Sequence, residues 1–357
     1  MTGLSIRGGC IVRIGIFGAS GAGKSTVFRA LTGLPAASAA PDARNRARPG
    51  QIKVSDPRLD LLESLYGSRK KVPVELTLLD FAANPKEQGK HQLDPSLFPL
   101  VRDLDALLIV IASFARPGPI ARQIASIDDE LIFADFEQAE RRLERVKKDR
   151  SASDFERAAL ERVLKFLESG TPLRSVAMTP QEERTFASFG FLSRKPALVV
   201  INCDIDDAAA PPDPADQQLA AARGLELFKL AAVFETELWE LPPTEQAELL
   251  KAAGLDAPAR DRLVAALYKR LGLITFYTAG EPEAHAWSIP AGATALDAAA
   301  RIHTDIARGF IRAEVVSFED FAALRSDARV KEAGKLRLEG KDYVMRDGDI
   351  IHIRFKI

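Results

Sequence analysis

Short apolar runs rich in β-branched residues alternate with helix-like stretches over the first 200 residues. Such runs predict β-strands when turn-forming or charged residues bound them, and here they occupy residues 11–17, 74–79, 106–112 and 197–201. The first run leads through a cluster of glycines into a helix-like stretch at 25–31. Because strands separated by helices favour parallel pairing with helices on the faces, we predict an α/β fold with a mostly parallel sheet.

Residues 128–167 interrupt this alternation with a long helical pattern. Apolar side chains recur there in steps of four and three, the spacing of a coiled-coil seam, at Ile132, Phe136, Ala139, Leu143 and Val146. After a break at 149–154, Ser153 and Glu156 have the spacing of a capping box and predict a second helix. Two helices with a short connection should form an antiparallel hairpin. Its charged flanks are either a solvated face or a docking arm for a polyanion or a protein.

The remainder of the chain predicts a loop, further helices and a second sheet. Three prolines mark a loop at 208–216, and residues 249–271 are helical again. From residue 273 onward, strand-like runs surround one alanine-rich helix at 295–308, and they lie at 274–278, 286–289, 311–316, 342–345 and 350–355. This pattern predicts a module of roughly 85 residues in which one helix crosses a mixed sheet.

Composition narrows the class of protein. The 357 residues suggest two or three domains at roughly 100–200 residues each. Lys and Arg total 49 against 50 Asp and Glu, which excludes a polycation that holds nucleic acid by bulk charge but not a local basic face. Two cysteines, Cys10 and Cys203, make no disulfide framework, so we expect a cytoplasmic protein. No apolar run reaches about 18 residues, so we expect no membrane span.

A phosphate-binding motif follows the first predicted strand. Residues 18–25 match G-x-x-x-x-G-K-S between a strand and a helix, the context that gives this pattern meaning. The glycines let backbone N–H groups wrap a polyphosphate at a helix N-terminus, Lys24 would reach the β- and γ-phosphates, and Ser25 would ligate Mg²⁺. We expect a purine nucleoside triphosphate, contacted by Gly18, Ala19, Ser20, Gly21, Ala22, Gly23, Lys24, Ser25 and Thr26.

A second oxygen ligand for the magnesium ion is expected at the end of a neighbouring strand. Asp80 directly follows the run at 74–79 and has this position. The alternative is an ordinary aspartate that ends a strand.

The chain resembles the YchF/Obg-like family of P-loop NTPases over most of its length. The most specific likeness lies near the C-terminus, at 271–280, 286–294, 302–305, 309–315, 331–341 and 347–349, and residues 56–60 and 129–135 resemble further family segments. The resemblance implies three parts. They are a P-loop G domain at 11–127 and 196–272, an inserted antiparallel coiled-coil helical domain at 128–195, and a C-terminal β-grasp TGS domain at 273–357.

The resemblance also implies a function. Family members bind ATP or GTP with Mg²⁺, hydrolyse it slowly and associate with ribosomes in translation and stress control, so we expect a weak ATPase or GTPase with a ribosome or RNA partner and no DNA or membrane partner. The resemblance places Asn202, Ala232 and Val233 beside the nucleotide. It makes Ser38 the nearest counterpart of a threonine on the magnesium side, together with Ser25 and Asp80.

Two motifs depart from the family pattern. The Asp-x-x-Gly sequence after the second magnesium strand has Ala83 in place of glycine, which removes easy access to positive φ and could stiffen the switch. Asn84 follows, either as a catalytic candidate that holds a water or without a role. Ile205 stands where the family's Asn-x-x-Glu has its carboxylate. Guanine thereby loses its best acceptor, so ATP preference or weak base selectivity follows.

Several interpretations stay open. The intact loop at 18–25 favours a switch with slow turnover, whereas Ala83 and Ile205 favour a diverged module that binds nucleotide, RNA or protein without significant turnover. A structural adaptor with a vestigial loop is a third possibility. The arginines at 44, 46 and 48 form either a mobile basic loop or a phosphate or RNA contact. The sequence at 303–305 is read as a packing or capping feature.

Overall fold

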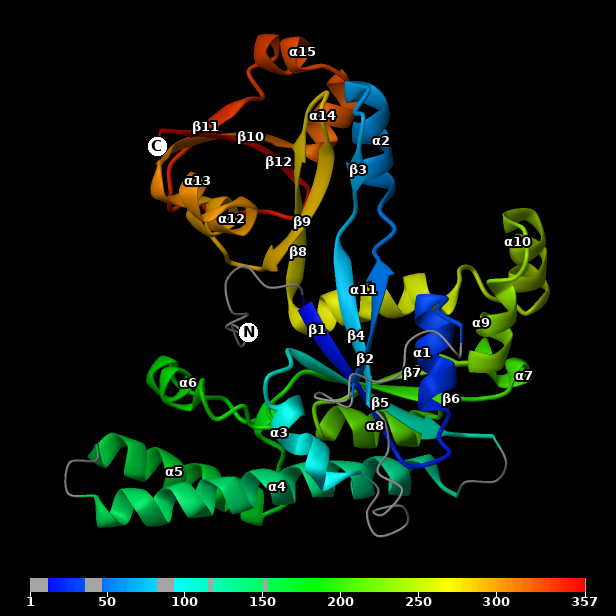
Figure 1. Cartoon of the computed structure of the whole chain (residues 1–357), viewed down its shortest axis with the longest axis vertical. Coiled ribbons are helices and arrows are strands. Elements are labelled where there is room, and N and C mark those ends of the chain that lie inside the picture. Colours follow the sequence, from blue (N-terminus) through cyan, green and yellow to red (C-terminus); the bar gives the residue numbers. More distant parts are fainter. Residues whose placement is uncertain (1–11, 36–46, 82–92, 115–117, 150–152, 357) are drawn as a thin grey trace.

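The computed structural model describes residues 12–35, 47–81, 93–114, 118–149 and 153–356, and these residues form two six-stranded sheets (Figure 1). The first sheet has the order β2-β4-β1-β5-β6-β7. All neighbours pair in parallel except β2, which is antiparallel to β4. The predicted mostly parallel sheet is therefore confirmed. Its strands are β1 (Val12–Phe17), β2 (Ala47–Lys53), β4 (Glu75–Phe81), β5 (Ala106–Ala112), β6 (Ala197–Asn202) and β7 (Glu226–Leu230).

Helices cover both faces of this sheet. On one face, α1 (Lys24–Thr32) and α11 (Ala259–Leu271) pack against β1 in a shared apolar core. On the other face, α3 (Phe98–Val101), the first half of α4 (Ile120–Lys148) and α8 (Pro214–Ala222) bury apolar side chains against β5 and β6. β5 is buried at every position, as a central parallel strand covered on both faces requires.

Shorter elements connect these layers. A 3₁₀ turn, η1 (Pro95–Leu97), precedes α3, and α7 (Ile205–Ala208) and α9 (Ala232–Leu238) follow β6 and β7. The predicted single helix at 249–271 is wrong. The chain instead forms α10 (Pro243–Ala252) and α11, because Gly254 takes a left-handed conformation and Pro258 precedes the second helix.

The long α4 pairs with α5 (Asp154–Glu168), and the two lie side by side in Figure 1. The predicted seam residues of α4 share one core cluster with α5. The predicted start at residue 128 is wrong, since α4 already begins at Ile120 and residue 128 lies within the helix. The predicted capping box is also wrong. Ser153 is the N-cap but makes no side-chain cap bond, and the Glu156 carboxylate instead accepts from Arg142 at 2.7 Å.

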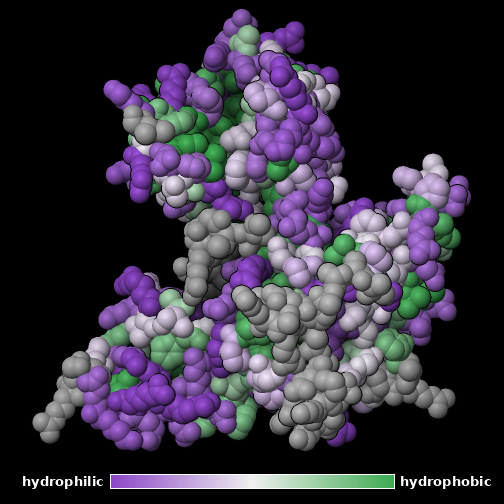
Figure 2. All heavy atoms as spheres, in the orientation of Figure 1, coloured by the Kyte–Doolittle hydropathy of each residue, from purple (hydrophilic) through white to green (hydrophobic). Residues whose placement is uncertain are grey.

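The chain returns from α5 to β6 through η2 (Leu173–Ser175) and α6 (Pro180–Phe186). Two buried carboxylates of α4 hold this return. Asp135 accepts from the backbone N–H groups of Leu192 and Ser193 at 2.8 and 2.7 Å. Asp128 accepts from Arg174 and Arg223. The surface of the helical pair is mostly hydrophilic in the view of Figure 2.

The second sheet has the order β11-β10-β12-β8-β9-β3. Its strands are β8 (Leu273–Ala279), β9 (Ala284–Pro290), β10 (Phe310–Ser317), β11 (Arg337–Glu339), β12 (Asp349–Phe355) and β3 (Lys71–Val72). The helices beside it are α12 (Ala295–Ile302), α13 (Thr304–Arg308), α14 (Phe318–Leu324) and α15 (Asp327–Glu332). Residues 342–345, predicted as a strand, form only an isolated bridge between Val344 and Thr294.

The predicted helix at 295–308 is interrupted at His303. Its backbone is extended there, and its Nδ1 accepts a hydrogen bond of 3.1 Å from the backbone N–H of Asp305. This imidazole therefore caps α13, in agreement with the expected capping feature.

One segment leaves the first sheet and joins the second. Between β2 and β4 the chain forms α2 (Pro57–Tyr66) and β3, and β3 pairs with β9. β2 and β4 rise together towards α2 in Figure 1. The predicted P-loop part at 11–127 includes both α2 and β3. No described helix has the length and apolar character needed to cross a membrane.

Candidate functional site

The phosphate loop lies at the carboxyl end of β1, the central strand, and leads directly into α1. Gly18 has φ of 146°, and a Cβ there would lie 2.1 Å from the carbonyl oxygen of Val110. Gly23 is the N-cap of α1 with φ of 87°. Both positions require glycine, one for a close approach of two strands and one for a left-handed turn. The loop thus presents backbone N–H groups at the positive end of a helix, the arrangement of an anion site.

Lys24 folds over this loop. Its ammonium donates to the carbonyl oxygens of Gly18 at 2.9 Å and Ala19 at 2.7 Å. Burial lowers the pKa of Lys24, and the charge of Asp80 opposes this shift. The two hydrogen bonds hold the ammonium group of Lys24 inside the loop, where it can contact a polyphosphate.

Asp80 and Ser25 meet beside Lys24. The Ser25 hydroxyl donates to Oδ2 of Asp80 at 3.0 Å, while Oδ1 of Asp80 is buried and has no hydrogen-bond partner within the described residues. Burial raises the pKa of Asp80, and the hydrogen bond from Ser25 and the charges of Lys24 and Arg48 oppose this rise. A buried carboxylate oxygen next to a serine hydroxyl is a donor set that fits Mg²⁺. The parts of the chain described here hold no group of three His, Cys, Asp or Glu side chains that could bind a metal ion among themselves.

Asn202 ties three segments together. It ends β6 and is 5% exposed. Its Nδ2 donates to the carbonyl oxygen of Ala22 in the phosphate loop at 3.2 Å, and its Oδ1 accepts from the N–H of Ala232 at the start of α9, also at 3.2 Å. A Cβ on Gly23 would lie 2.2 Å from Nδ2 of Asn202. Val233, next to Ala232, is 66% exposed. The structure thus brings Asn202 and the segment at 232–233 to the phosphate loop.

Ile205, at the expected carboxylate position, packs into an apolar cluster with Cys203, Ala208 and Phe234. It is the first residue of α7, and its neighbours Asp204 and Asp206 are exposed. This position therefore offers an apolar side chain where a carboxylate would read guanine.

Sequence reasoning missed the placement of Arg48. It lies on β2 directly opposite Asp80 of β4, is 8% exposed, and its guanidinium stands 5.1 Å from the centre of the Phe28 ring. Pro49 and Gly50 follow it and weaken any strand signal in the sequence. Ser38, Ala83 and Asn84 lie outside the described residues, as do the arginines at 44 and 46.

Comparisons with known proteins extend along the whole chain. A family model, YchF-GTPase_C, described as a protein of unknown function, matches residues 273–356. The ribosome-binding ATPase YchF of Haemophilus ducreyi is 35% identical over 97% of this chain and 99% of its own length. The Bacillus subtilis protein of the same name is 36% identical over 96% of this chain and 99% of its own length.

A solved structure gives the same result. The YchF GTPase of Schizosaccharomyces pombe matches with a TM-score of 0.84 and 26% identity, covering 99% of this chain and all of that chain. Full-length identity above a third and the shared mixed α/β fold lead to one conclusion: the chain belongs to the YchF family.

Proposed function

We propose that this protein binds a purine nucleoside triphosphate together with Mg²⁺ in the phosphate loop and hydrolyses it slowly. One observation carries the proposal. Lys24 and Ser25 open α1 while Asp80 lies at the penultimate position of β4, and the three side chains converge at the mouth of the loop. An ammonium, a hydroxyl and a buried carboxylate are the groups that a magnesium–triphosphate complex needs from a protein.

Each residue has a separate task in this proposal. Lys24 and the backbone N–H groups of the loop offer hydrogen-bond donors to the phosphate oxygens. Ser25 and Asp80 would hold Mg²⁺, with Ser38 as a further expected ligand, and the bound ion neutralises charge on the β- and γ-phosphates. Asn202 keeps the loop in register with the segment at 232–233, which would border the base. Catalysis then consists of positioning and electrostatic stabilisation. Asn84 is the candidate for orienting water.

The expected domain organisation is part of the proposal. The first sheet would be a P-loop G domain at 11–127 and 196–272, with a coiled-coil insertion at 128–195, and residues 273–357 would be a β-grasp TGS domain. Support comes from the packing of α4 on α5 and from the single α12–α13 unit beside β8 and β10. It also comes from the match of the C-terminal family model.

The names of the bacterial relatives point to the proposed partner. Both bacterial relatives are named ribosome-binding ATPases. We therefore propose that this protein associates with ribosomes, through RNA or protein contacts, as a cytoplasmic regulator of translation or stress responses.

Calorimetry tests the nucleotide site. The full chain is titrated with Mg·ATP, Mg·GTP and a non-hydrolysable analogue of each, and Lys24→Ala is the matched variant. We expect binding to the parent and a loss of at least tenfold in affinity for the variant. Phosphate release is then measured for both proteins. Equal release by parent and variant would show that the site does not turn nucleotide over.

A second candidate is binding without significant turnover, and the packing of Ile205 favours it. With an apolar side chain at this position, the base contributes less selective binding energy for orienting the triphosphate. This candidate predicts tight binding of the analogues with no phosphate release above that of Lys24→Ala. Similar affinities for Mg·ATP and Mg·GTP would accompany it.

A further inference from the structure

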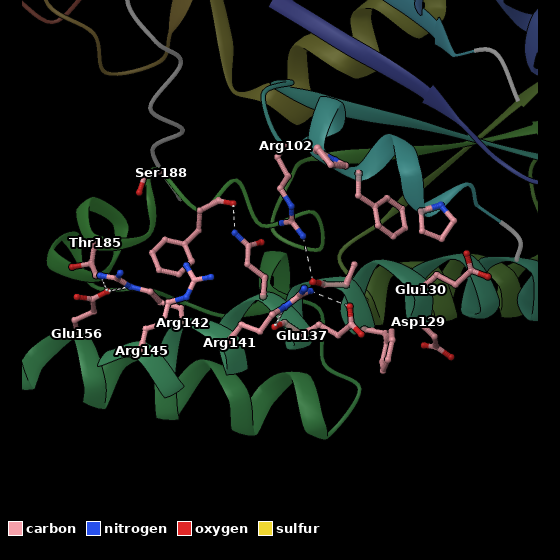
Figure 3. A pocket seen from close by; sticks show the side chains of 17 residues that line it. Arg102, Asp129, Glu130, Glu137, Arg141, Arg142, Arg145, Glu156, Thr185 and Ser188 are labelled. Atoms are coloured by element: carbon pink, nitrogen blue, oxygen red, sulfur yellow. Dashed lines mark hydrogen bonds and ion pairs between the residues drawn. The ribbon is translucent and has the colours of Figure 1, made fainter. Parts of the chain in front are cut away.

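A groove of about 1320 Å³ runs along the outer face of α4. Its opposite wall comes from η1 and α3 at one end, and from the start of α5 and the segment after α6 at the other (Figure 3). Its lining on α4 extends from Asp129 to Arg145. At a rise of 1.5 Å per residue, this stretch of helix is about 24 Å long. The proposed nucleotide chemistry uses none of these residues.

The middle of the groove is apolar. Phe133 is 61% exposed although both neighbours, Ile132 and Ala134, are buried in the core. Phe98 and Phe189 contribute to the opposite wall. A large exposed aromatic ring inside a concave surface marks an interaction site, because leaving it in water forfeits roughly 2 kcal/mol of transfer free energy.

The two ends of the groove are lined by side chains of opposite sign, and the carboxylates already have partners: Asp129 pairs with Arg223 at 3.0 Å, and Glu130 accepts from the backbone N–H of Leu93 at 2.8 Å. Figure 3 shows Asp129 and Glu130 at one end and Arg142 and Arg145 at the other. Asp129, Phe133, Glu137, Arg141 and Arg145 follow one another at intervals of four, so they form one ridge that is inclined to the axis of α4.

Most arginines of the groove already have carboxylate partners. Arg141 pairs with Glu137 at 3.2 Å and Arg142 with Glu156 at 2.7 Å. Arg102 pairs with buried Asp135 at 3.1 Å. For Arg145, the described part of the chain supplies no ion-pair partner. A nucleic acid needs several uncompensated cations in a row, and this surface does not offer them.

We propose that this groove binds an amphipathic helix of a protein partner. Its apolar stripe would cover Phe133, a carboxylate would meet Arg145, and a neutral residue would lie over the end lined by Asp129 and Glu130, whose carboxylates already have partners. A second helix can pack across this inclined ridge, because side chains at intervals of four on one helix fit between those of another. The proposal does not depend on the nucleotide site.

The test uses the full chain and a phage-displayed library of random peptides of about 16 residues, a length that spans the groove. Selection on the parent is followed by binding measurements with selected peptides on three variants. Phe133→Ser removes the apolar centre and Arg145→Glu reverses the charge of the basic end. Lys147→Glu is the matched control, because it makes the same charge change on exposed surface two residues away, outside the groove.

We expect peptides with apolar residues at helical spacing and a carboxylate near one end. Affinity should fall at least tenfold for Phe133→Ser and several-fold for Arg145→Glu, and stay within twofold for Lys147→Glu. Absence of enrichment, or peptides that bind all variants equally, would overturn the proposal. Titration with single-stranded RNA is the second arm. RNA binding that falls with Phe133→Ser and Arg145→Glu would assign the groove to nucleic acid instead.

Discussion

Gly21 and Gly23 stand two positions apart in the phosphate loop and have similar left-handed backbones, with φ of 81° and 87°. Their surroundings differ. An added Cβ meets nothing within 4 Å at Gly21 but lies 2.2 Å from Nδ2 of Asn202 at Gly23. The pair therefore separates backbone strain from the clash with Asn202.

We predict that Gly21→Ala lowers the free energy of unfolding by about 1 kcal/mol, the cost of a left-handed alanine. Gly23→Ala should cost about 2–3 kcal/mol more, because Asn202 must move and release two buried backbone partners. Chemical denaturation of the nucleotide-free proteins measures both values. Equal losses in the two variants would contradict the role given to Asn202.

Lys195 is a partly buried cation that makes stability depend on pH. Its ammonium donates to the carbonyl oxygens of Arg102 and Leu104, and burial lowers its pKa to about 8, although Asp105, Asp135 and Asp103 oppose the shift. The unfolded chain binds this proton up to a pKa near 10.5, so it holds more protons than the native state between pH 8 and 10.5. The contribution of Lys195 to stability therefore rises with pH in this window.

We predict that the free energy of unfolding of the parent, relative to Lys195→Met, increases from pH 8 to pH 10 by up to about 3 kcal/mol. Lys147→Met makes the same substitution on exposed surface and is the matched control. Denaturant titrations at several pH values give the three curves. A parallel course of parent and Lys195→Met would show that the ammonium is not desolvated in the fold.

The site residues that belong to a short sequence motif could be predicted from the sequence. Lys24, Ser25 and Asp80 follow from a loop pattern and a strand end, and the structure brings them together. The contact between Gly23 and Asn202 joins residues 179 positions apart. The position of the Ile205 side chain depends on its packing against Phe234 of α9. Local patterns carry no information on such contacts.

At the scale of elements, Asp128 ties α4 to η2 and to the end of α8. This side chain is fully buried and receives Arg174 and Arg223, whereas the adjacent Asp129 is 60% exposed and shares Arg223 at 3.0 Å. Removing one member of a buried ion pair leaves the remaining charge uncompensated. The two aspartates thus offer the same chemical change in two environments.

We predict that Asp128→Ala lowers the free energy of unfolding by about 3–5 kcal/mol, and Asp129→Ala by less than about 1 kcal/mol. Thermal and denaturant unfolding of the two variants measure the difference. Similar losses would mean that α4 is held by its apolar contacts alone.

Element boundaries were less predictable than the elements themselves. The apolar seam correctly indicated the paired part of α4, but Ile124 and Ile127 bury against the sheet and extend the helix towards its N-terminus. The helical period of 3.6 residues is the same where α4 packs on the sheet and where it packs on α5. The hydrophobic pattern therefore cannot show where the first contact ends and the second begins. The side chain of Glu156 has two possible partners, the cap and Arg142, and the structure places it with Arg142 across the helical pair.

At the scale of the whole molecule, the second sheet is completed by residues that lie 200 positions earlier in the chain. Leu59 and Leu62 of α2 are at most 2% exposed and share a core with Tyr277 and Phe321. Tyr66 stacks on Phe321 with ring centres 5.1 Å apart. At the other end of α2, Arg58 pairs with Asp347 at 2.6 Å.

Because α2 packs with the second sheet, domain boundaries drawn along the sequence describe the molecule incompletely. A strand pattern and a family resemblance both delimit the last module at residue 273, since each follows the chain in order. The segment that contains α2 and β3 lies between β2 and β4, and Asp80 of the candidate site is the penultimate residue of β4. The ribbon of β2 and β4 therefore connects the phosphate loop with the second sheet.

We predict that residues 273–357 alone do not form a stable unit. Burial of Leu59 and Leu62 contributes roughly 3–6 kcal/mol, comparable to the whole stability of a small domain. A fusion that supplies residues 54–74 through a flexible linker should restore cooperative thermal unfolding and dispersed amide resonances. The same fusion with Leu59→Ala and Leu62→Ala is the control and should resemble the isolated fragment, because it keeps α2 but removes its buried side chains. If the fragment alone unfolds cooperatively at the same temperature as the fusion, α2 and β3 contact the second sheet without stabilising it. In that case the ribbon of β2 and β4 does not hold the two sheets of the molecule together.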